Sequence, residues 1–161
     1  MSADRKLQVS GTVDAPPQQV FALLADPARH TELDGAGMLR GLGSPCDPVT
    51  AVGDSFVMNM DQDGIGEYQM RNEITAFEAD RRIAWAPAIH PPGALSHILG
   101  ELDPSGHTYG WELAPTAEGG TQITHVYDWS GVADENAIGI YPRVSQEQMS
   151  GSITRIGDAL R

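Results

Sequence analysis

The chain has 161 residues and a formal net charge of −12 at pH 7. This length suits a single domain, residues 1–161, that buries a substantial core without metals or disulfides. Proteins that bind phosphate backbones or anionic membranes usually carry clustered Lys and Arg, so the acidic balance argues against both partners. There is no apolar run of the roughly 20 residues that cross a bilayer, and none that would form a secretory signal at the start. We therefore expect a cytoplasmic protein, not inserted in a membrane, whose partners are small molecules or other proteins.

The first part of the chain predicts a strand followed by two short helices. Residues 6–14 alternate apolar and polar side chains, which is typical of a strand. Proline is tolerated in the first turn of a helix, and a helical pattern runs over 17–25. Asp26 suits the N-cap of a second short helix that reaches Leu33. Residues 38–42 predict a second strand.

The middle of the chain reads as a meander of alternating strands separated by turns rich in Gly and Asp. The predicted strands are 55–61, 67–78, 82–88, 108–115 and 121–130. The segment 90–106 fits either a helical turn or an extension of the preceding strand, and both alternatives stay open.

After Gly131 the apolar pattern changes to a helical period. The apolar positions that follow Pro142 on one helical face are Val144, Met149, Ile153, Ile156 and Leu160. Gly151 and Gly157 each disfavour the helix by about 1 kcal/mol relative to Ala, so packing against the sheet must hold it. The order predicts an α+β fold: a curved antiparallel sheet of six to seven strands wraps around a long C-terminal helix, with two short helices after the first strand.

This order resembles the SRPBCC superfamily, also called START-like or helix-grip proteins, and in particular its polyketide cyclase/dehydrase group. The segments that resemble the family motifs follow one another in family order at 13–21, 26–30, 52–56, 82–85 and 120–124. Two further segments, 34–41 and 58–61, look like an actinobacterial branch of unassigned function. The resemblance covers nearly the whole chain and implies a cavity between the concave sheet and the last helix. It does not fix a reaction, because this fold carries lipid carriers, hormone receptors, cyclases and co-chaperones.

The residues that would line this cavity follow from strand parity, with the more apolar face of each strand pointing inward. The predicted ligand-binding residues are Phe56, Met58, Met60, Tyr68, Met70, Asn72, Trp85, Tyr109, Trp111, Ile123, His125 and Tyr127 from the strands, with Met149 and Ile153 from the helix. Parity adds Ile74, Ile83, Leu113 and Trp129 from the strands, and Ile156 from the helix. Met and aromatic enrichment with a few polar groups is typical of an adaptable pocket, although the same side chains would also fill an ordinary core.

Asn72 and His125 are the polar residues that parity places inside. Histidine titrates near neutrality, so His125 is the candidate for acid–base catalysis, with a partly exposed strand histidine as the alternative. Asn72 would either orient a ligand carbonyl or satisfy a buried backbone group. No histidine pair has the helical spacing of a zinc enzyme, and no second cysteine accompanies Cys46, so we expect neither a metal nor another cofactor.

Three functions are compatible with these observations. The leading hypothesis is a module, monomer or homodimer, that binds a small hydrophobic or amphipathic molecule, aromatic or polyketide-like. The second is a polyketide aromatase/cyclase or dehydratase in which His125 or a Tyr moves protons. The third is a co-chaperone-like protein-interaction module, which predicts a filled cavity and an exposed apolar patch.

Overall fold

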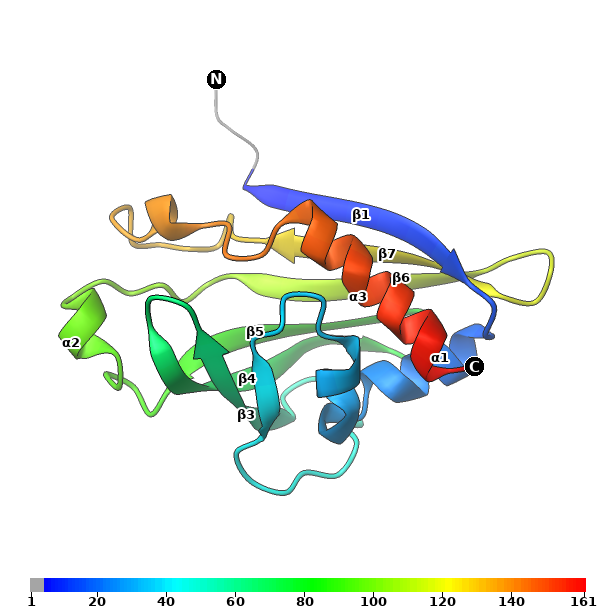
Figure 1. Cartoon of the computed structure of the whole chain (residues 1–161), viewed down its shortest axis with the longest axis horizontal. Helices are drawn as coiled ribbons and strands as arrows, with labels where there is room; N and C mark the ends of the chain where they lie inside the picture. The colour runs from blue at the N-terminus through cyan, green and yellow to red at the C-terminus, as the bar shows by residue number, and fades with distance from the viewer. Residues whose placement is uncertain (1–4) are drawn as a thin grey trace.

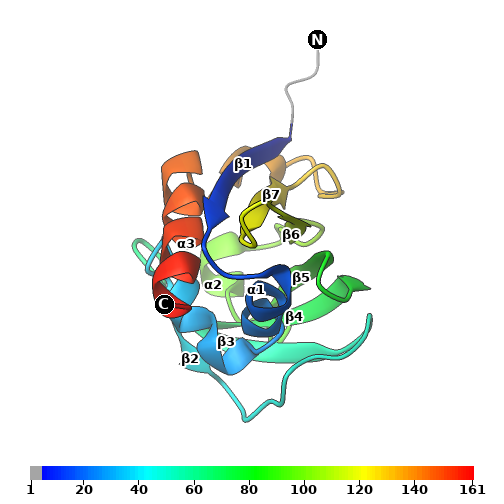
Figure 2. The same cartoon turned by 90° about the vertical axis from the view of Figure 1, so that its right-hand side faces the viewer.

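The computed structural model describes residues 5–161 and contains one curved, unclosed antiparallel sheet of seven strands (Figure 1). The strand order is β1-β7-β6-β5-β4-β3-β2, so β1 and β2 form the two edges. Figure 2 shows the sheet bending around the short helices, with the C-terminal helix α3 along the open side. These features confirm the predicted α+β helix-grip fold.

The N-terminal elements follow the predicted order. Strand β1 spans Lys6–Val13 and pairs with β7, and helix α1 spans Pro17–Leu24. Pro17 occupies the first turn of α1, where its missing N–H leaves no helical hydrogen bond unmade. Helix α1 buries its apolar side chains in the main core and contacts β5 and β6, so it closes one end of the curved sheet.

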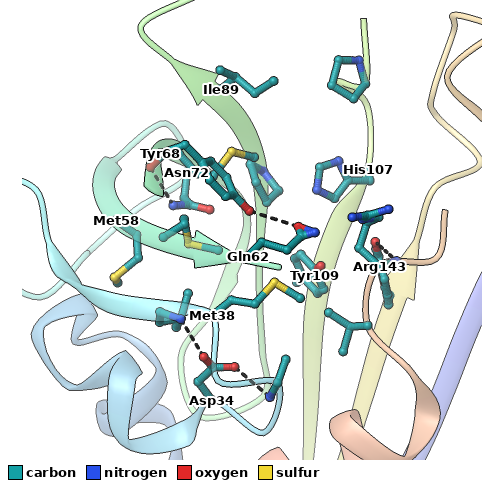
Figure 3. A pocket seen from close by; sticks show the side chains of 18 of the residues that line it. Asp34, Met38, Met58, Gln62, Tyr68, Asn72, Ile89, His107, Tyr109 and Arg143 are labelled. Carbon is teal, nitrogen blue, oxygen red and sulfur yellow. Dashed lines mark hydrogen bonds between the residues drawn. The ribbon is translucent and has the colours of Figure 1, made fainter. Parts of the chain in front are cut away.

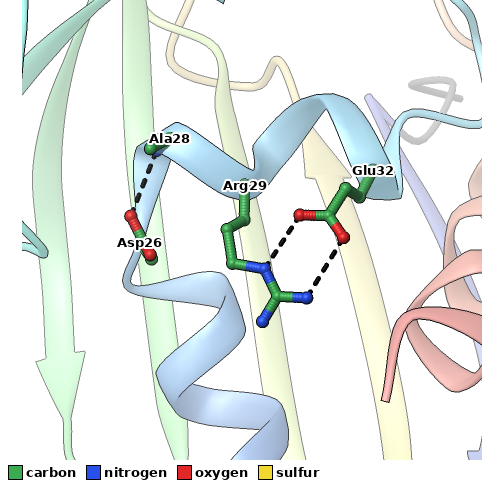
Figure 4. A network of polar contacts seen from close by, with 4 residues as sticks. All are labelled: Asp26, Ala28, Arg29 and Glu32. Carbon is green, nitrogen blue, oxygen red and sulfur yellow. Dashed lines mark hydrogen bonds and ion pairs between the residues drawn. The ribbon is translucent and has the colours of Figure 1, made fainter. Parts of the chain in front are cut away.

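The second helix, η1, is a 3₁₀ helix over Pro27–Leu33. The carboxylate of its N-cap Asp26 accepts a hydrogen bond from the backbone N–H two residues on, at 3.2 Å (Figure 4). On the exposed side of η1, Arg29 donates from Nε and Nη2 to the carboxylate of Glu32 at 2.8 and 3.1 Å. An exposed pair of this kind contributes about 0–1 kcal/mol, so η1 is held mainly by the residues that it buries.

One half of the sheet consists of β2 (Leu39–Leu42), β3 (Ser55–Gln62), β4 (Gly66–Glu78) and β5 (Arg82–His90). Each strand matches its predicted range to within two residues at either end. The register between β4 and β5 shifts after Ile74, beyond the β4 positions assigned to the pocket. For that reason the bulge leaves the predicted inward face of β4 unchanged.

The segment that the sequence left open contains both predicted alternatives in succession. Strand β5 continues two residues past its predicted end, as far as His90, and a single helical turn, α2 (Ser96–Leu99), follows. The side chain of Leu95, just before α2, is buried against the rest of the protein.

The second half of the sheet consists of β6 (Thr108–Pro115) and β7 (Thr121–Asp128). Strand β7 is shorter than predicted because the carboxylate of Asp128 accepts hydrogen bonds from both the backbone N–H and the hydroxyl of Ser130, which turns the chain. A short 3₁₀ turn, η2 (Ile138–Ile140), then leads toward the last helix.

Helix α3 spans Gln146–Ala159 and begins with a capping box. The Ser145 hydroxyl accepts from the backbone N–H of Gln148 at 3.1 Å, while the Gln148 side chain accepts from the backbone N–H of Ser145 at 2.9 Å. The sequence predicted that Val144 lies on the apolar face of this helix, but Val144 precedes the helix. Leu160 is the C-cap residue.

Helix α3 packs very closely against the loop after η1. A side chain at Gly35 would place its Cβ 2.1 Å from the carbonyl oxygen of Gln148. The backbone N–H of Gly35 also donates to the Ser152 hydroxyl at 3.0 Å. At the neighbouring Gly151, an added Cβ would lie 3.8 Å from the Gly35 Cα, which is an ordinary contact.

We therefore expect opposite effects from two glycine substitutions at this crossing. Gly35→Ala should destabilise the fold by roughly 1–3 kcal/mol because its methyl group overlaps helix backbone. Gly151→Ala should stabilise it by up to about 1 kcal/mol because alanine favours the helix and fits the space. Urea unfolding of both variants checks this, and an unchanged stability of Gly35→Ala would show that the crossing is not tight.

Candidate functional site

The concave face of the sheet encloses a cavity of about 350 Å³ (Figure 3). Its walls come from the inner faces of β3–β7, from η1 with the loop after it, from α2, and from residues 138–144 before α3. This volume lies within the range of small-molecule sites in proteins, and most of the lining side chains are aromatic, aliphatic or methionine.

Most of the residues that strand parity assigned to a pocket line this cavity. They are Phe56, Met58, Met60, Tyr68, Met70, Asn72, Trp85, Tyr109, Trp111, His125 and Tyr127. Their common feature is an inward position on one of the strands β3–β7, and the register shift in β4 lies beyond these positions. Contact between any of them and a ligand stays a prediction.

Eight residues that parity placed in the lining lie elsewhere. Six are buried in the main core: Ile74, Ile83, Leu113, Ile123, Ile153 and Ile156. Met149 and Trp129 pack in a second cluster. Met149 and Ile153 lie outside the cavity because α3 packs against β1, where Ile153 contacts Gly11. Only Ser152 of α3 reaches the cavity wall, so the expected position of the cavity, between the sheet and this helix, is corrected.

The cavity also contains lining residues that the sequence reasoning missed. Three of them continue the inward parity of β3 and β5: Gln62 and Ile89 lie just beyond the predicted strand ends, and Pro87 lies within its predicted strand but was not assigned to the lining. The others come mostly from segments without a repeating pattern: His30, Asp34, Ala36, Met38, Leu39, Ile65, Leu95, Ile98, Leu99, Pro104, His107, Ile140, Tyr141, Arg143, Val144 and Ser152.

At the η1 end of the cavity, His30 sits in an aromatic cluster. Its Nε2 donates to the carbonyl oxygen of Leu24 at 2.7 Å. Its ring stacks on Trp85 with centroids 4.9 Å apart and meets the edge of Phe56 at 5.2 Å. Burial lowers the pKa of His30 to about 4, so the imidazole is neutral at pH 7.

His125 is held in a similar way on the sheet. Its Nδ1 donates to the carbonyl oxygen of Gly110 at 2.9 Å, and its ring stacks on Trp111 with centroids 3.6 Å apart. Burial lowers the pKa of His125 to about 4, so the ring is neutral at pH 7 and its Nδ1 proton stays in the hydrogen bond to the Gly110 carbonyl. The Nε1 donor of Trp111 is buried with no hydrogen-bond partner among residues 5–161.

A third histidine, His107, belongs to a group of hydrogen-bonded residues in the cavity wall. The Tyr141 hydroxyl donates to the carbonyl oxygen of Pro104 and lies 3.0 Å from Nδ1 of His107, which donates to it. Burial lowers the pKa of His107 to about 4 and raises the pKa of Tyr141. These hydrogen bonds hold the neutral rings of His107 and Tyr141 against the cavity.

Gln62 and the exposed Arg143 form one rim of the cavity, and Asp34 lies apart from them (Figure 3). With its oxygen toward Arg143, the Gln62 amide accepts from Nη2 and Nε at 2.6 and 3.1 Å. The other amide atom then faces the Tyr68 hydroxyl, 3.3 Å away. The carboxylate of Asp34 accepts from two backbone N–H groups of its own loop at 2.9 and 2.7 Å, so it shapes that loop.

Within residues 5–161, no three His, Cys, Asp or Glu side chains gather in an arrangement that would hold a metal ion. In the same part of the chain, no helix combines the length and apolar character that a membrane crossing requires.

The chain belongs to the family described as Activator of Hsp90 ATPase homolog 1-like protein, whose family model matches residues 14–160. This family lies within the SRPBCC superfamily, which confirms the resemblance seen in the sequence. The fold and the match together place the protein in this class.

An uncharacterised protein of Mycobacterium tuberculosis is 31% identical over 131 residues, which cover 80% of this chain and 50% of that protein. The chain thus spans about half the length of the curated relatives it matches. Among solved structures, protein Ms6760 of Mycobacterium smegmatis has a TM-score of 0.67 at 18% identity, covering 98% of this chain and 91% of its own. DynU16, from the dynemicin biosynthetic locus, has a TM-score of 0.60 at 20% identity, covering 98% of this chain and 48% of its own. At these identities the structures show a shared fold alone.

The three cavity histidines should make stability depend on pH. Their folded pKa of about 4 lies below the value of about 6.5 in an unfolded chain, so protonation favours unfolding. The stability they provide is complete above pH 6.5 and is lost as pH falls toward 4, by about 2 kcal/mol for each histidine at pH 5.

Urea unfolding at pH 7, 6 and 5 measures this loss. His125→Gln should reduce the difference in unfolding free energy between pH 7 and pH 5 by about 2 kcal/mol, because one of the three groups is removed. A variant with the same pH dependence as the natural chain would contradict the burial of a neutral His125.

Proposed function

We propose that this protein binds a small hydrophobic or amphipathic molecule in the cavity of the concave sheet. The observation that carries the proposal is a space of about 350 Å³ lined chiefly by methionine, aromatic and aliphatic side chains. Such a lining favours apolar ligands, since each Å² of apolar surface removed from water contributes about 25 cal/mol. Burial of about 200 Å² of ligand would therefore contribute about 5 kcal/mol before the entropic cost of association is subtracted.

The composition of the lining supports an aromatic ligand. Stacked and edge-on ring pairs already line the two ends of the cavity, around His30 and around Tyr109. Methionine side chains such as Met58 and Met70 adapt to irregular shapes, which suits a pocket that accepts related molecules. The fold shared with DynU16, a protein of the dynemicin biosynthetic locus, supports a polyketide-like, biosynthetic small molecule as one class of ligand.

The state of the histidines supports binding over acid–base catalysis. At pH 7, His125 is neutral and its Nδ1 proton is committed to a backbone carbonyl. Its other ring nitrogen can therefore accept a hydrogen bond that orients a ligand. With a pKa of about 4, the same nitrogen is a weak base for proton transfer near neutrality. An open cavity also favours ligand binding over the co-chaperone-like alternative, which predicts a filled one. The proposal also includes a cytoplasmic location and a monomer or homodimer. It includes a small molecule rather than nucleic acid as the ligand, which the net charge of −12 supports.

A fluorescent apolar probe tests the proposal. N-phenyl-1-naphthylamine is neutral and should bind the natural chain with increased fluorescence. Ile89→Trp should weaken this binding about tenfold or more, because the indole would project into the cavity from β5. The matched control is Ala88→Trp, which places the same indole on the opposite, exposed face of the strand and should leave the affinity unchanged.

Circular dichroism of both variants confirms that they fold. The proposal fails if the probe does not bind the natural chain, or if Ile89→Trp binds it as tightly as Ala88→Trp does. Native mass spectrometry of protein purified from its host should in addition show a bound small molecule that is absent from Ile89→Trp.

A further inference from the structure

One rim of the cavity carries a positive charge that no acidic side chain within residues 5–161 neutralises. Arg143 contributes the only charged cation to the lining among residues 5–161, since the three buried histidines are neutral at pH 7. Within the same residues, no carboxylate lies within 4.0 Å of its guanidinium. This is notable in a chain with 22 acidic and 10 basic residues, where an arginine could easily find an acid partner.

The position of Arg143 is fixed by its backbone and by a neutral amide. Its backbone N–H donates to the Tyr127 hydroxyl at 3.1 Å, which ties the segment before α3 to the sheet. Gln62 takes two of the guanidinium N–H groups from across the rim. A guanidinium has five such donors, so three remain for another acceptor, and the amide holds the group without cancelling its charge.

Two acids of adjoining segments, Asp34 and Asp61, are engaged elsewhere. Both oxygens of Asp34 accept from backbone N–H groups, and Asp61 faces Arg40 at 4.0 Å. The charge of Arg143 instead acts on the cavity wall: burial raises the pKa of Tyr68 and Tyr141, and the guanidinium counters that rise in both. The charges of Asp61 and Asp103 act in the opposite direction on Tyr68 and Tyr141, so it is the guanidinium of Arg143 itself that attracts an anion at this point of the rim.

We propose that the ligand of this cavity is an amphipathic acid, whose carboxylate or comparable anionic group binds Arg143 while its apolar body fills the cavity. This inference rests on the proposed function and specifies its ligand class. Paired hydrogen bonds from a guanidinium to an anion are stronger than those to a neutral acceptor, so the anionic group would also set the direction in which the ligand enters. The three guanidinium N–H groups that Gln62 leaves free are the donors that would bind the anion.

Two dyes that differ by one acidic group test the inference. 8-Anilino-1-naphthalenesulfonate is N-phenyl-1-naphthylamine with a sulfonate added, and both fluoresce when bound in apolar surroundings. The natural chain should bind the sulfonate about fivefold more tightly than the neutral dye. Raising the salt concentration from 50 to 500 mM should reduce this preference, because the contact lies at an exposed rim.

Substitutions assign the preference to one residue. Arg143→Gln should lower the ratio of the two affinities to about one or below, while Arg143→Lys, which keeps the charge but loses the planar fork, should give an intermediate ratio. Arg155→Gln is the matched control, because Arg155 is exposed on α3 outside the cavity lining and its loss changes the net charge equally. This control should keep the natural ratio.

The inference is overturned if the natural chain does not prefer the sulfonate, if Arg143→Gln retains the preference, or if Arg155→Gln loses it to the same extent. Binding of the neutral dye with no preference for the sulfonate would refute the acidic ligand and leave the proposed function intact. Failure of both dyes to bind would refute the proposed function itself.

Discussion

The close contact between helix α3 and the loop after η1 is the constraint on which the site depends. Because Gly35 has no side chain, the loop backbone approaches the carbonyl of Gln148 and donates to the hydroxyl of Ser152. This contact, together with the packing of Ile153 on β1, holds the helix along the open side of the sheet. The middle of the concave face is consequently left to short segments, which cover it without filling it.

The space that results is apolar and has a fixed lining. Its histidines donate to the carbonyls of Leu24 and Gly110 or to the Tyr141 hydroxyl, so their polar edges are largely satisfied before any ligand arrives. A buried neutral imidazole then behaves as part of an aromatic wall, stacked on Trp85 or Trp111. This arrangement favours shape and apolar area as the basis of selectivity, with few hydrogen bonds to fix orientation.

The polar rim differs in character from that interior. Arg143 and Gln62 belong to segments far apart in the chain, and their hydrogen bonds join the β3–β4 hairpin to the approach to α3. A positive group at the mouth of an apolar space provides what an amphipathic acid requires, one charged end and one desolvated body. The net charge of −12 disfavours anions overall, so a positive group at this point is a local exception.

The sequence by itself determined the strands, their order and most of their inward faces, because side chains alternate strictly along a strand and residues such as Met58 and Trp111 follow that period. It also indicated α3, but not where the helix would lie, and so Met149 was assigned to the cavity although it packs in the core. Only the tertiary structure decided that position and brought Arg143 to the rim. Loops and caps carry no period, and their placement depends on long-range contacts, such as that of Gly35 with α3, that no local pattern encodes.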